Sequence, residues 1–314
     1  MTEFGTRHGG VIALAVMVAL LPLGLPDLYT YDIAINAGFN AIVCVGLNLL
    51  IGYAGQISLG HAGFFGLGAY ASGILTTRYG WPPLAALAAG AVGVAALSWL
   101  VARAVLGLKG HFLAMATMGV GIIVAIVLNT ESGLTGGSDG LMVGDFSVFG
   151  LVLRGERAWY WVVGGLLVLV IAAAGNLIDS PVGRALRALH GSEIAAEVAG
   201  IDTARTKIMV FVLSAVLAAI VGSLYVHYAG MITPSRAGFM KSIELVTMVV
   251  FGGMASSFGA LVGAVFLTVL PQVLTAFEDY ETIILGVIMV GTMIFMPRGL
   301  VVTLRDLLRI GRRP

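Results

Sequence analysis

Long apolar runs separated by short polar breaks make up most of this sequence. A helix needs about 20 mainly apolar residues to cross a hydrocarbon core of about 30 Å. The pattern predicts ten membrane-spanning helices, near residues 9–25, 32–51, 57–77, 82–102, 111–129, 159–178, 204–228, 241–256, 258–276 and 282–297. The run 241–256 is the weakest, because Gly252 and Gly253 interrupt it. We therefore expect an all-α polytopic membrane protein in which residues 1–314 form a single transmembrane domain.

The composition supports this interpretation. Hydrophobic residues make up 59% of the 314 residues and charged residues 11%, and the mean hydropathy is +1.02. Soluble domains carry about 25% charged residues. A net charge of +1 gives no support for nucleic-acid binding, and the single cysteine, Cys44, cannot form an internal disulfide. Residues 23–26 are a poor cleavage site for a signal peptide, so we expect the first apolar run to be retained as a helix.

The basic residues predict the orientation. If ten helices place both ends of the chain on one side, most basic residues fall on that side, and cytoplasmic loops are the ones enriched in Lys and Arg. The side with both termini would carry Arg7, Arg103, Lys109, Arg184, Arg187, Arg205, Lys207, Arg298, Arg305, Arg309, Arg312 and Arg313. The other side would carry Arg78, Arg154, Arg157, Arg236 and Lys241. We therefore expect both termini in the cytoplasm. The tail, residues 298–314, alternates leucine and arginine, as an amphipathic helix on the membrane surface would.

The polar break at residues 179–205 predicts two short cytoplasmic helices. Ser180 suits the N-cap of the first, which should end at Gly191. Ser192 suits the N-cap of the second, which should end at Gly200 in the left-handed conformation. Asp202 or Thr203 then caps the next long helix. Small apolar residues share one face of the pair and charged residues occupy the others, which is typical either of a surface that docks another protein or of a connector lying on lipid headgroups.

The stretch from residue 46 to residue 75 is rich in glycine. Glycines at every third position let helices approach closely, and two glycines around Tyr53 allow the chain to unwind within the membrane. Polar residues gather at this break, where they either line a translocation path or make hydrogen bonds between packed helices. The candidate path residues are Tyr53, Gly55, Gln56, Ser58, Gly60 and His61.

Two further features of the sequence are candidates for a functional role. The external loop, residues 130–158, holds a glycine-rich stretch whose Gly136, Gly137, Asp139 and Gly140 suit tight turns, either as a ligand-facing surface or as an ordered exposed loop. Glu244 lies inside an apolar run, which makes it a candidate proton relay by default. Lys241 lies three residues earlier on the same helical face, so we expect a structural ion pair between them.

The sequence predicts no catalytic or metal site. The histidines do not fall at ligand spacing, no serine, histidine and aspartate set recurs on one face, and no GxxxxGK[ST] phosphate loop occurs. We expect a protein that is not an enzyme and that binds no cofactor of its own.

Four blocks of this sequence resemble one family. They are GLNLLIGYAGQISLGHAGFFGLGAY at residues 46–70, LKGHFLAMATMG at 108–119 with LTGGSDGL at 134–141, GRALRALHGSEIAAEVAGIDTARTKIMVFVLSA at 183–215, and SIELVTMVVFGGMASSFGALVGA at 242–264 with MPRGL at 296–300. They resemble the permease subunits of ABC importers for branched-chain amino acids, of the LivM type in the hydrophobic amino acid uptake family. Order and spacing resemble the family from about residue 35 to the end of the sequence.

The resemblance implies which partners this chain has and which of its residues contact them. The chain would pair with a homologous second permease, two cytoplasmic ATPase subunits that bind ATP and magnesium, and a periplasmic or lipid-anchored binding protein, in the inner membrane of a bacterium. Its ATPase-coupling residues would be Arg184, Arg187, Glu193, Ile194, Ala195, Glu197, Val198 and Gly200. The binding protein would dock on the external loop. Related permeases move urea, short amides or aromatic acids, which stay alternative substrates. An ion-coupled secondary transporter and a structural membrane subunit without a path are alternatives of other classes.

Overall fold

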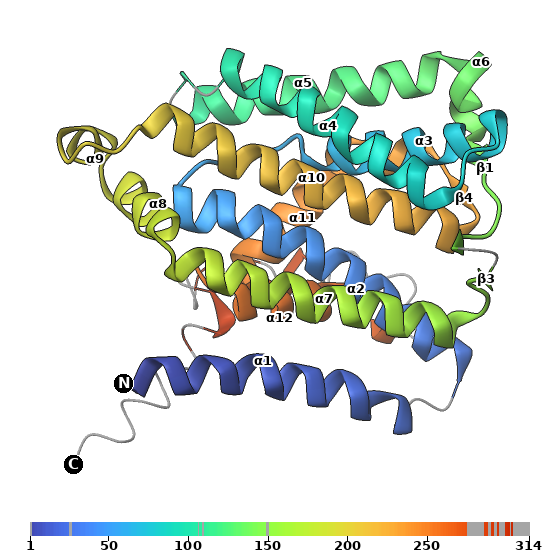
Figure 1. Ribbon diagram of the computed structural model, residues 1–314, viewed down its shortest axis with the longest axis horizontal. Helices are drawn as coiled ribbons and strands as arrows, with labels where there is room; N and C mark the ends of the chain where they lie inside the picture. Colours follow the sequence, from blue (N-terminus) through green and yellow to red (C-terminus); the bar gives the residue numbers. More distant parts are fainter. Residues whose placement is uncertain are drawn as a thin grey trace.

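The computed structural model describes residues 2–24, 27–105, 107–108, 110–148, 151–274, 286–287, 290–291, 294, 299–301 and 303. Within these ranges, nine helices of 14 or more residues lie roughly side by side (Figure 1). They are α1 (Thr2–Leu20), α2 (Leu28–Asn48), α3 (His61–Tyr79), α4 (Pro83–Val105), α5 (His111–Thr130), α7 (Glu156–Asp179), α10 (Thr203–Ala229), α11 (Phe239–Gly252) and α12 (Ser257–Leu274). The predicted span 282–297 and the predicted amphipathic tail 298–314 lie largely outside the described residues.

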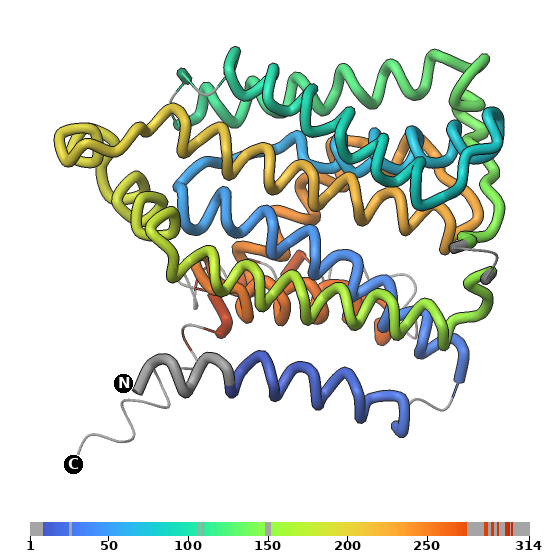
Figure 2. Tube along the Cα trace, in the orientation of Figure 1, coloured from blue at the N-terminus to red at the C-terminus, as the bar shows by residue number. Residues whose placement is uncertain are grey.

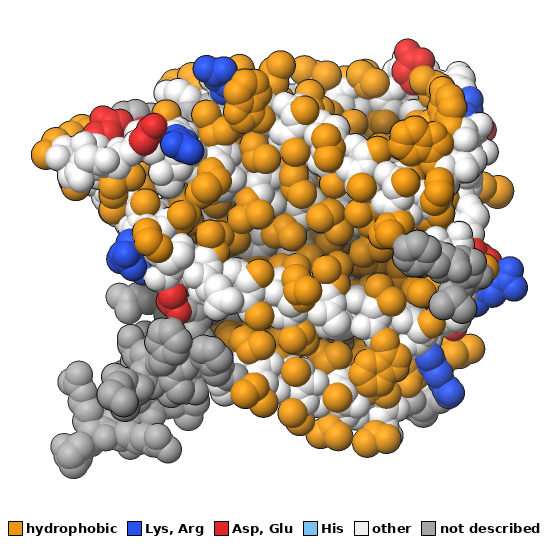
Figure 3. Space-filling view, in the orientation of Figure 1, with side chains coloured by type: hydrophobic (Ala, Val, Ile, Leu, Met, Phe, Trp, Pro, Cys, Tyr) orange, Lys and Arg blue, Asp and Glu red, His pale blue; other side chains and the backbone are white. Residues whose placement is uncertain are grey.

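Among the described residues, six segments are long and apolar enough to cross a membrane: 28–53, 83–105, 111–130, 156–179, 203–229 and 257–274. They confirm an all-α, multi-pass membrane protein, while the count of ten stays a prediction. Figure 3 shows the same character on one face, where side chains are mainly apolar between two ends that carry the lysines, arginines and acids. That arrangement matches a bilayer core flanked by two aqueous surfaces.

Short helices and strands lie at the two ends of the bundle. At one end lie α8 (Pro181–Gly191) and α9 (Glu193–Val198) (Figure 1). At the other end lie α6 (Ser132–Thr135) and two antiparallel strand pairs: β1 (Leu141–Met142) pairs with β4 (Met231–Ile232), and β2 (Ser147–Val148) pairs with β3 (Leu151–Val152). Short 3₁₀ turns complete the connections at η1 (Leu21–Leu23), η3 (Gly137–Asp139) and η4 (Pro234–Ala237).

The centre of the bundle is α2, which runs between α7 and α10 (Figure 2). Its residues from Ala37 to Cys44 are almost all buried, as expected for a helix that is apolar on every side. Small residues set the distance between neighbouring helices: a Cβ at Gly68 would lie 2.2 Å from the Ala219 carbonyl oxygen, and one at Gly60 would lie 2.2 Å from that of Thr117. The predicted role of these glycines in close packing is confirmed.

The chain breaks at the place that the glycines predicted. After α2 it forms a π-helical turn, η2 (Leu49–Tyr53), and Gly55 takes a positive φ of 68°. Residues 55–60 are not helical, and α3 begins at His61. A side-chain hydrogen bond of 2.7 Å joins His61 Nε2 to Ser214 Oγ, and Ser214 lies in the middle part of α10. The helix α3 therefore starts about halfway through the bundle.

A second break separates α11 from α12. Residues 253–256 are not helical, and Ala255 has a φ of +58°. The backbone N–H of Ala255 donates to the side chain of Asn48 at 3.0 Å, which satisfies part of the exposed backbone there. The interruption at Gly252 and Gly253 is thus confirmed, and it leaves α11 with only 14 residues.

Candidate functional site

The two short helices α8 and α9 begin and end where local chemistry predicts. Ser180 Oγ accepts from the N–H of Gly183 at 3.4 Å, and Ser192 Oγ accepts from that of Ala195 at 3.3 Å. Gly200 closes α9 with a φ of +82°, and Asp202 caps α10 by accepting from the N–H of Arg205 at 2.9 Å. These caps fix the helix pair at the end of the bundle.

The acidic residues of α9 turn inward. Glu193 forms an ion pair with Lys207 of α10, whose side chain is buried, and we call these two residues the α9–α10 pair. Glu197 Oε1 accepts from Thr203 Oγ1 at 2.8 Å. Both acids therefore hold α9 against the start of α10. Sequence reasoning missed Lys207 as a partner, although a lone lysine at the start of an apolar run is a signal that a charge partner exists.

The outward face of α9 is apolar. The side chains of Ile194 and Val198 are 69% and 86% exposed, and Ala195 and Gly200 are exposed beside them. The arginines of α8 reach back along the chain: Arg187 donates to the Ile178 carbonyl at 3.1 Å and Arg184 to that of Asp179 at 3.4 Å. The predicted coupling residues that are exposed on or directly after α9 without a polar contact of their side chains are Ile194, Ala195, Val198 and Gly200, while Arg184, Arg187 and Glu197 are exposed but also make hydrogen bonds within the chain.

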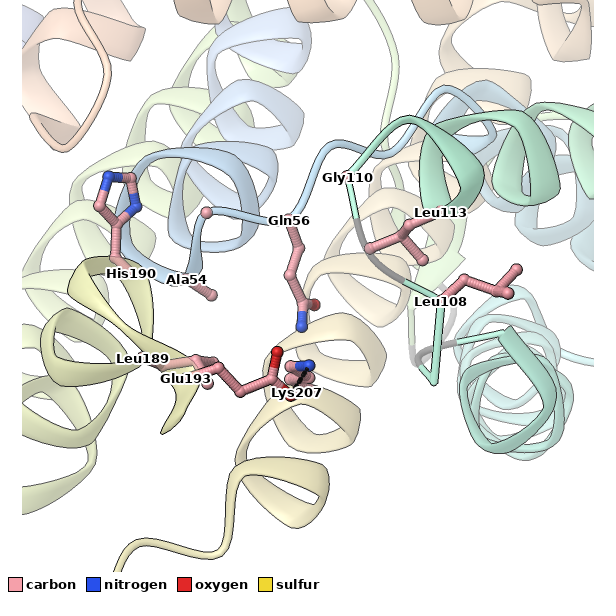
Figure 4. Close-up of a pocket in the computed structure, with 10 residues that line it drawn as sticks. Ala54, Gln56, Leu108, Gly110, Leu113, Leu189, His190, Glu193 and Lys207 are labelled. Atoms are coloured by element: carbon pink, nitrogen blue, oxygen red, sulfur yellow. Dashed lines mark hydrogen bonds and ion pairs between the residues drawn. The ribbon is translucent and has the colours of Figure 1, made fainter. Parts of the chain in front are cut away.

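A cavity of about 140 Å³ lies behind this helix pair (Figure 4). Its walls come from the chain break, α8, the α9–α10 pair, the α4–α5 connection and the first turn of α5. The Gln56 side chain points into it toward Glu193 and Lys207 (Figure 4). Gln56 is only 4% exposed, and neither its amide oxygen nor its amide nitrogen has a hydrogen-bond partner among the described residues. The cavity can hold water or a small polar molecule at a charged wall.

The other predicted path residues lie deeper and pack together. His61 is fully buried and joins Ser58 Oγ, at 2.8 Å, to Ser214 Oγ, at 2.7 Å. The next residue of α3, Ala62, donates its N–H to Ser242 Oγ of α11 at 3.1 Å. Tyr53, Gly55 and Gly60 lie along the same break, of which Gly60 is buried and Gly55 exposed. His61 thus joins the chain break and α3 to α10, Ala62 joins α3 to α11, and the place of Ser58 and His61 on a path stays a prediction.

The external loop has the shaped backbone that its glycines predicted. Gly136, Gly137 and Gly140 all have positive φ, and a Cβ at Gly140 would lie 2.3 Å from the Ile232 carbonyl oxygen. Asp139 is exposed. Contact of this loop with a binding protein stays a prediction.

Lys241 and Glu244 form the expected ion pair, at 2.8 Å within one turn of α11, and we call them the α11 pair. Among the described residues, no group of three or more His, Cys, Asp or Glu side chains is placed to hold a metal ion.

The comparisons with known proteins agree with this architecture. The family described as "Branched-chain amino acid transport system / permease component" matches residues 29–293. The chain belongs to this family. The permease is 32% identical to the high-affinity branched-chain amino acid transport system permease protein LivM of Escherichia coli K12, over 96% of this chain and 76% of the relative. No solved structure matches the permease.

Two other relatives show the breadth of the likeness. The permease is 26% identical to LivH, a second permease protein of the high-affinity branched-chain amino acid transport system of the same strain, over 83% of this chain and 90% of the relative. It is 30% identical to the ribose import permease protein RbsC of that strain, over 81% and 79% of the two chains. A transport subunit of an ABC system, rather than an enzyme, is the class that family membership gives.

Proposed function

We propose that this chain is the membrane-spanning permease subunit of an ATP-driven importer for branched-chain amino acids, with a homologous second permease completing the translocation path. Two ATPase subunits bind ATP and magnesium on the cytoplasmic side, and a binding protein delivers the amino acid outside. The observation that carries the proposal is the capped α8–α9 pair, whose outward apolar face lies at one end of the bundle in a chain that matches the family over residues 29–293.

The proposed coupling runs through α9. Ile194 and Val198 enter a cleft on an ATPase subunit, where their burial supplies contact energy. Movement of that subunit then pulls on α9, and the α9–α10 pair transmits the pull to α10, which packs along α3 and α4. The long helix α10 acts as the lever that switches the permease between inward and outward access.

The proposed orientation follows from the charges. The α8–α9 end and both termini lie in the cytoplasm of a bacterium, because most of the basic residues fall on that side of a ten-helix arrangement. The binding protein then meets the opposite end, where Gly136, Gly137, Asp139 and Gly140 shape an exposed loop. The membrane is the inner membrane.

The test is purification of the tagged chain in a mild detergent, followed by identification of the subunits that come with it. We expect a second permease and two ATPases, and ATP hydrolysis that rises when leucine and the binding protein are added. Parallel assays with urea, a short amide and an aromatic acid test the alternative substrates. A lone chain that still catalyses gradient-driven uptake would overturn the importer assignment.

A double variant tests the docking face itself. Ile194→Asp with Val198→Asp places two charges where the ATPase cleft is expected, so the ATPases should no longer co-purify. Met142→Asp is the matched control, because Met142 is equally exposed and apolar but lies in β1 at the opposite end. Loss of the ATPases with both variants, or with neither, would count against docking through α9.

A further inference from the structure

The α11 pair lies near half depth in the bundle. Ser242, between its two residues, accepts a hydrogen bond from Ala62, whose neighbour His61 contacts Ser214 of α10. Ser214 follows the start of α10 by eleven residues and precedes its end by 15. At 1.5 Å per residue, these separations are about 16 Å and about 22 Å.

A second contact gives the same depth. Cys44 Sγ approaches the Leu245 carbonyl oxygen at 3.7 Å, and Leu245 directly follows the α11 pair. Cys44 lies 16 residues after the start of α2 and nine before the end of η2, which corresponds to about 24 Å and about 14 Å. Both reference helices therefore place the pair well inside the apolar part of the bundle, away from either end.

The α11 pair is nonetheless on the surface of this chain. The side chain of Glu244 is 48% exposed and that of Lys241 is 14% exposed. The exposed residues of α11 are Met240, Ile243 and Glu244, which share one face at the spacing i, i+3, i+4. Together with the partly exposed Lys241 and Thr247 beside them, we call them the α11 strip. The opposite face of α11 is buried against the bundle.

A charged strip at this depth does not face lipid. Ionisable groups at the centre of a membrane cost several kcal/mol when they meet hydrocarbon, and they almost always face a bundle interior or a water-filled cavity. The face in Figure 3 shows the contrast, since its charges lie at the two ends and its middle is apolar. The α11 strip must therefore border water or another protein in the assembled membrane complex.

We propose that the α11 strip lines the translocation path and binds the transported amino acid as a zwitterion, with Glu244 accepting from its ammonium group and Lys241 donating to its carboxylate. The apolar Met240 and Ile243 on the same strip contact an aliphatic side chain. This inference rests on the proposed function and adds to it the residues that recognise the substrate.

The pairing explains why the strip is stable without substrate. Lys241 Nζ and Glu244 Oε1 are 2.8 Å apart, so each charge compensates the other when the path is empty. A zwitterion exchanges one internal ion pair for two intermolecular ones and leaves the net charge of the site unchanged. Backbone interruption nearby is consistent with a path, because α3 and α11 both start near half depth, after segments 55–60 and 230–238 in which the α-helix is interrupted.

The first experiment measures water access. In a Cys44→Ala background, Ile243→Cys is compared with Leu169→Cys, which is 62% exposed at mid-length on α7 and serves as the lipid-facing control. The complete importer in liposomes is treated with a charged, membrane-impermeant methanethiosulfonate. We expect Ile243→Cys to react at least about tenfold faster than Leu169→Cys, and leucine with the binding protein to slow its reaction. Equal rates at the two positions would overturn the inference.

The second experiment measures recognition. Glu244→Gln should lower leucine uptake per ATP hydrolysed by about tenfold or more, since one charge contact with the substrate is lost. Asp145→Asn is the matched control, because Asp145 pairs with Arg154 at 3.0 Å in the exposed external loop. Normal uptake by Glu244→Gln would overturn recognition by the α11 pair.

The two proposals fail in distinguishable ways. If the unmodified complex imports leucine but the α11 strip excludes the reagent, the inference fails and the importer assignment stands. If the unmodified complex imports no amino acid, the proposed function fails and zwitterion recognition fails with it, whatever the rate of labelling at Ile243→Cys.

Discussion

The α9–α10 pair and the α11 pair contain the same two residue types but do different things. Glu193 and Lys207 join two helices that are separated by a connection, and the lysine is buried. Lys241 and Glu244 lie one turn apart on a single helix, and the glutamate is half exposed. The first pair holds one element against another. The second pair leaves a charged face exposed near half the depth of the bundle. The comparison shows that the role of an ion pair depends on what it connects and what surrounds it.

The largest expected effect comes from breaking the α9–α10 pair. Lys207→Met removes the ion pair with Glu193 beside the cavity, and loss of a hydrogen bond to a charged group costs about 1.5–3 kcal/mol. We expect a lower melting temperature and loss of substrate-stimulated ATP hydrolysis in the assembled importer. The exchanged pair, Lys207→Glu with Glu193→Lys, should recover part of both. If Lys207→Met kept the stability and the coupling of the wild type, the α9–α10 pair would contribute to neither.

The glutamates of the two pairs can be compared directly by the same substitution. Glu193→Gln should lower the melting temperature of the purified chain by more than Glu244→Gln does, because Glu193 faces a buried lysine and Glu244 is half exposed. Fluorescence-monitored thermal unfolding in one detergent measures both variants. Equal shifts would remove the structural distinction between the two pairs.

A smaller, opposite effect is expected at Gln56. Its amide lies in the cavity without a described partner, and an unsatisfied buried polar group costs about 1–3 kcal/mol. Gln56→Leu should therefore raise the melting temperature slightly, while Leu113→Gln, which adds an amide to the opposite wall, should lower it. A decrease with Gln56→Leu would show that ordered water or a ligand satisfies the amide.

The smallest effect is expected at the exposed pair of Asp145 and Arg154. Both side chains are more than half exposed, and surface ion pairs contribute about 0–1 kcal/mol. Asp145→Asn should leave the melting temperature and leucine uptake unchanged within error. A large loss of uptake would instead place this loop in contact with the binding protein.

Much of the local structure was predictable. Ser180, Ser192 and Asp202 cap their helices as predicted, since capping depends on residues only three positions apart. The break near Gly55 was predictable because glycine permits the positive φ observed there. Lys241 and Glu244 were predictable as a pair because one helical turn brings them together.

Other parts of the site needed the fold. Contact of Glu193 and Glu197 with an ATPase stays a prediction, and what the fold adds is their contacts within the chain, with Lys207 and Thr203 at the start of α10. Glu193 and Lys207 are 14 residues apart, on two helices joined by a connection. Sequence spacing alone does not say how such helices are oriented, so this pairing could not be predicted. His61 was a candidate path residue, and its contact with Ser214 depends on how α3 packs against α10.

The sequence by itself determined the membrane class, the presence of long apolar spans, the helix caps and the places where helices break, because apolar length, capping and glycine conformations act over a few neighbouring residues. Tertiary structure decided which charges face inward, how deep each one lies and which faces stay open. Depth and exposure arise when helices distant in sequence pack side by side. The half-depth position of Glu244 therefore depends on contacts such as those of Ser242 with Ala62 and of Leu245 with Cys44.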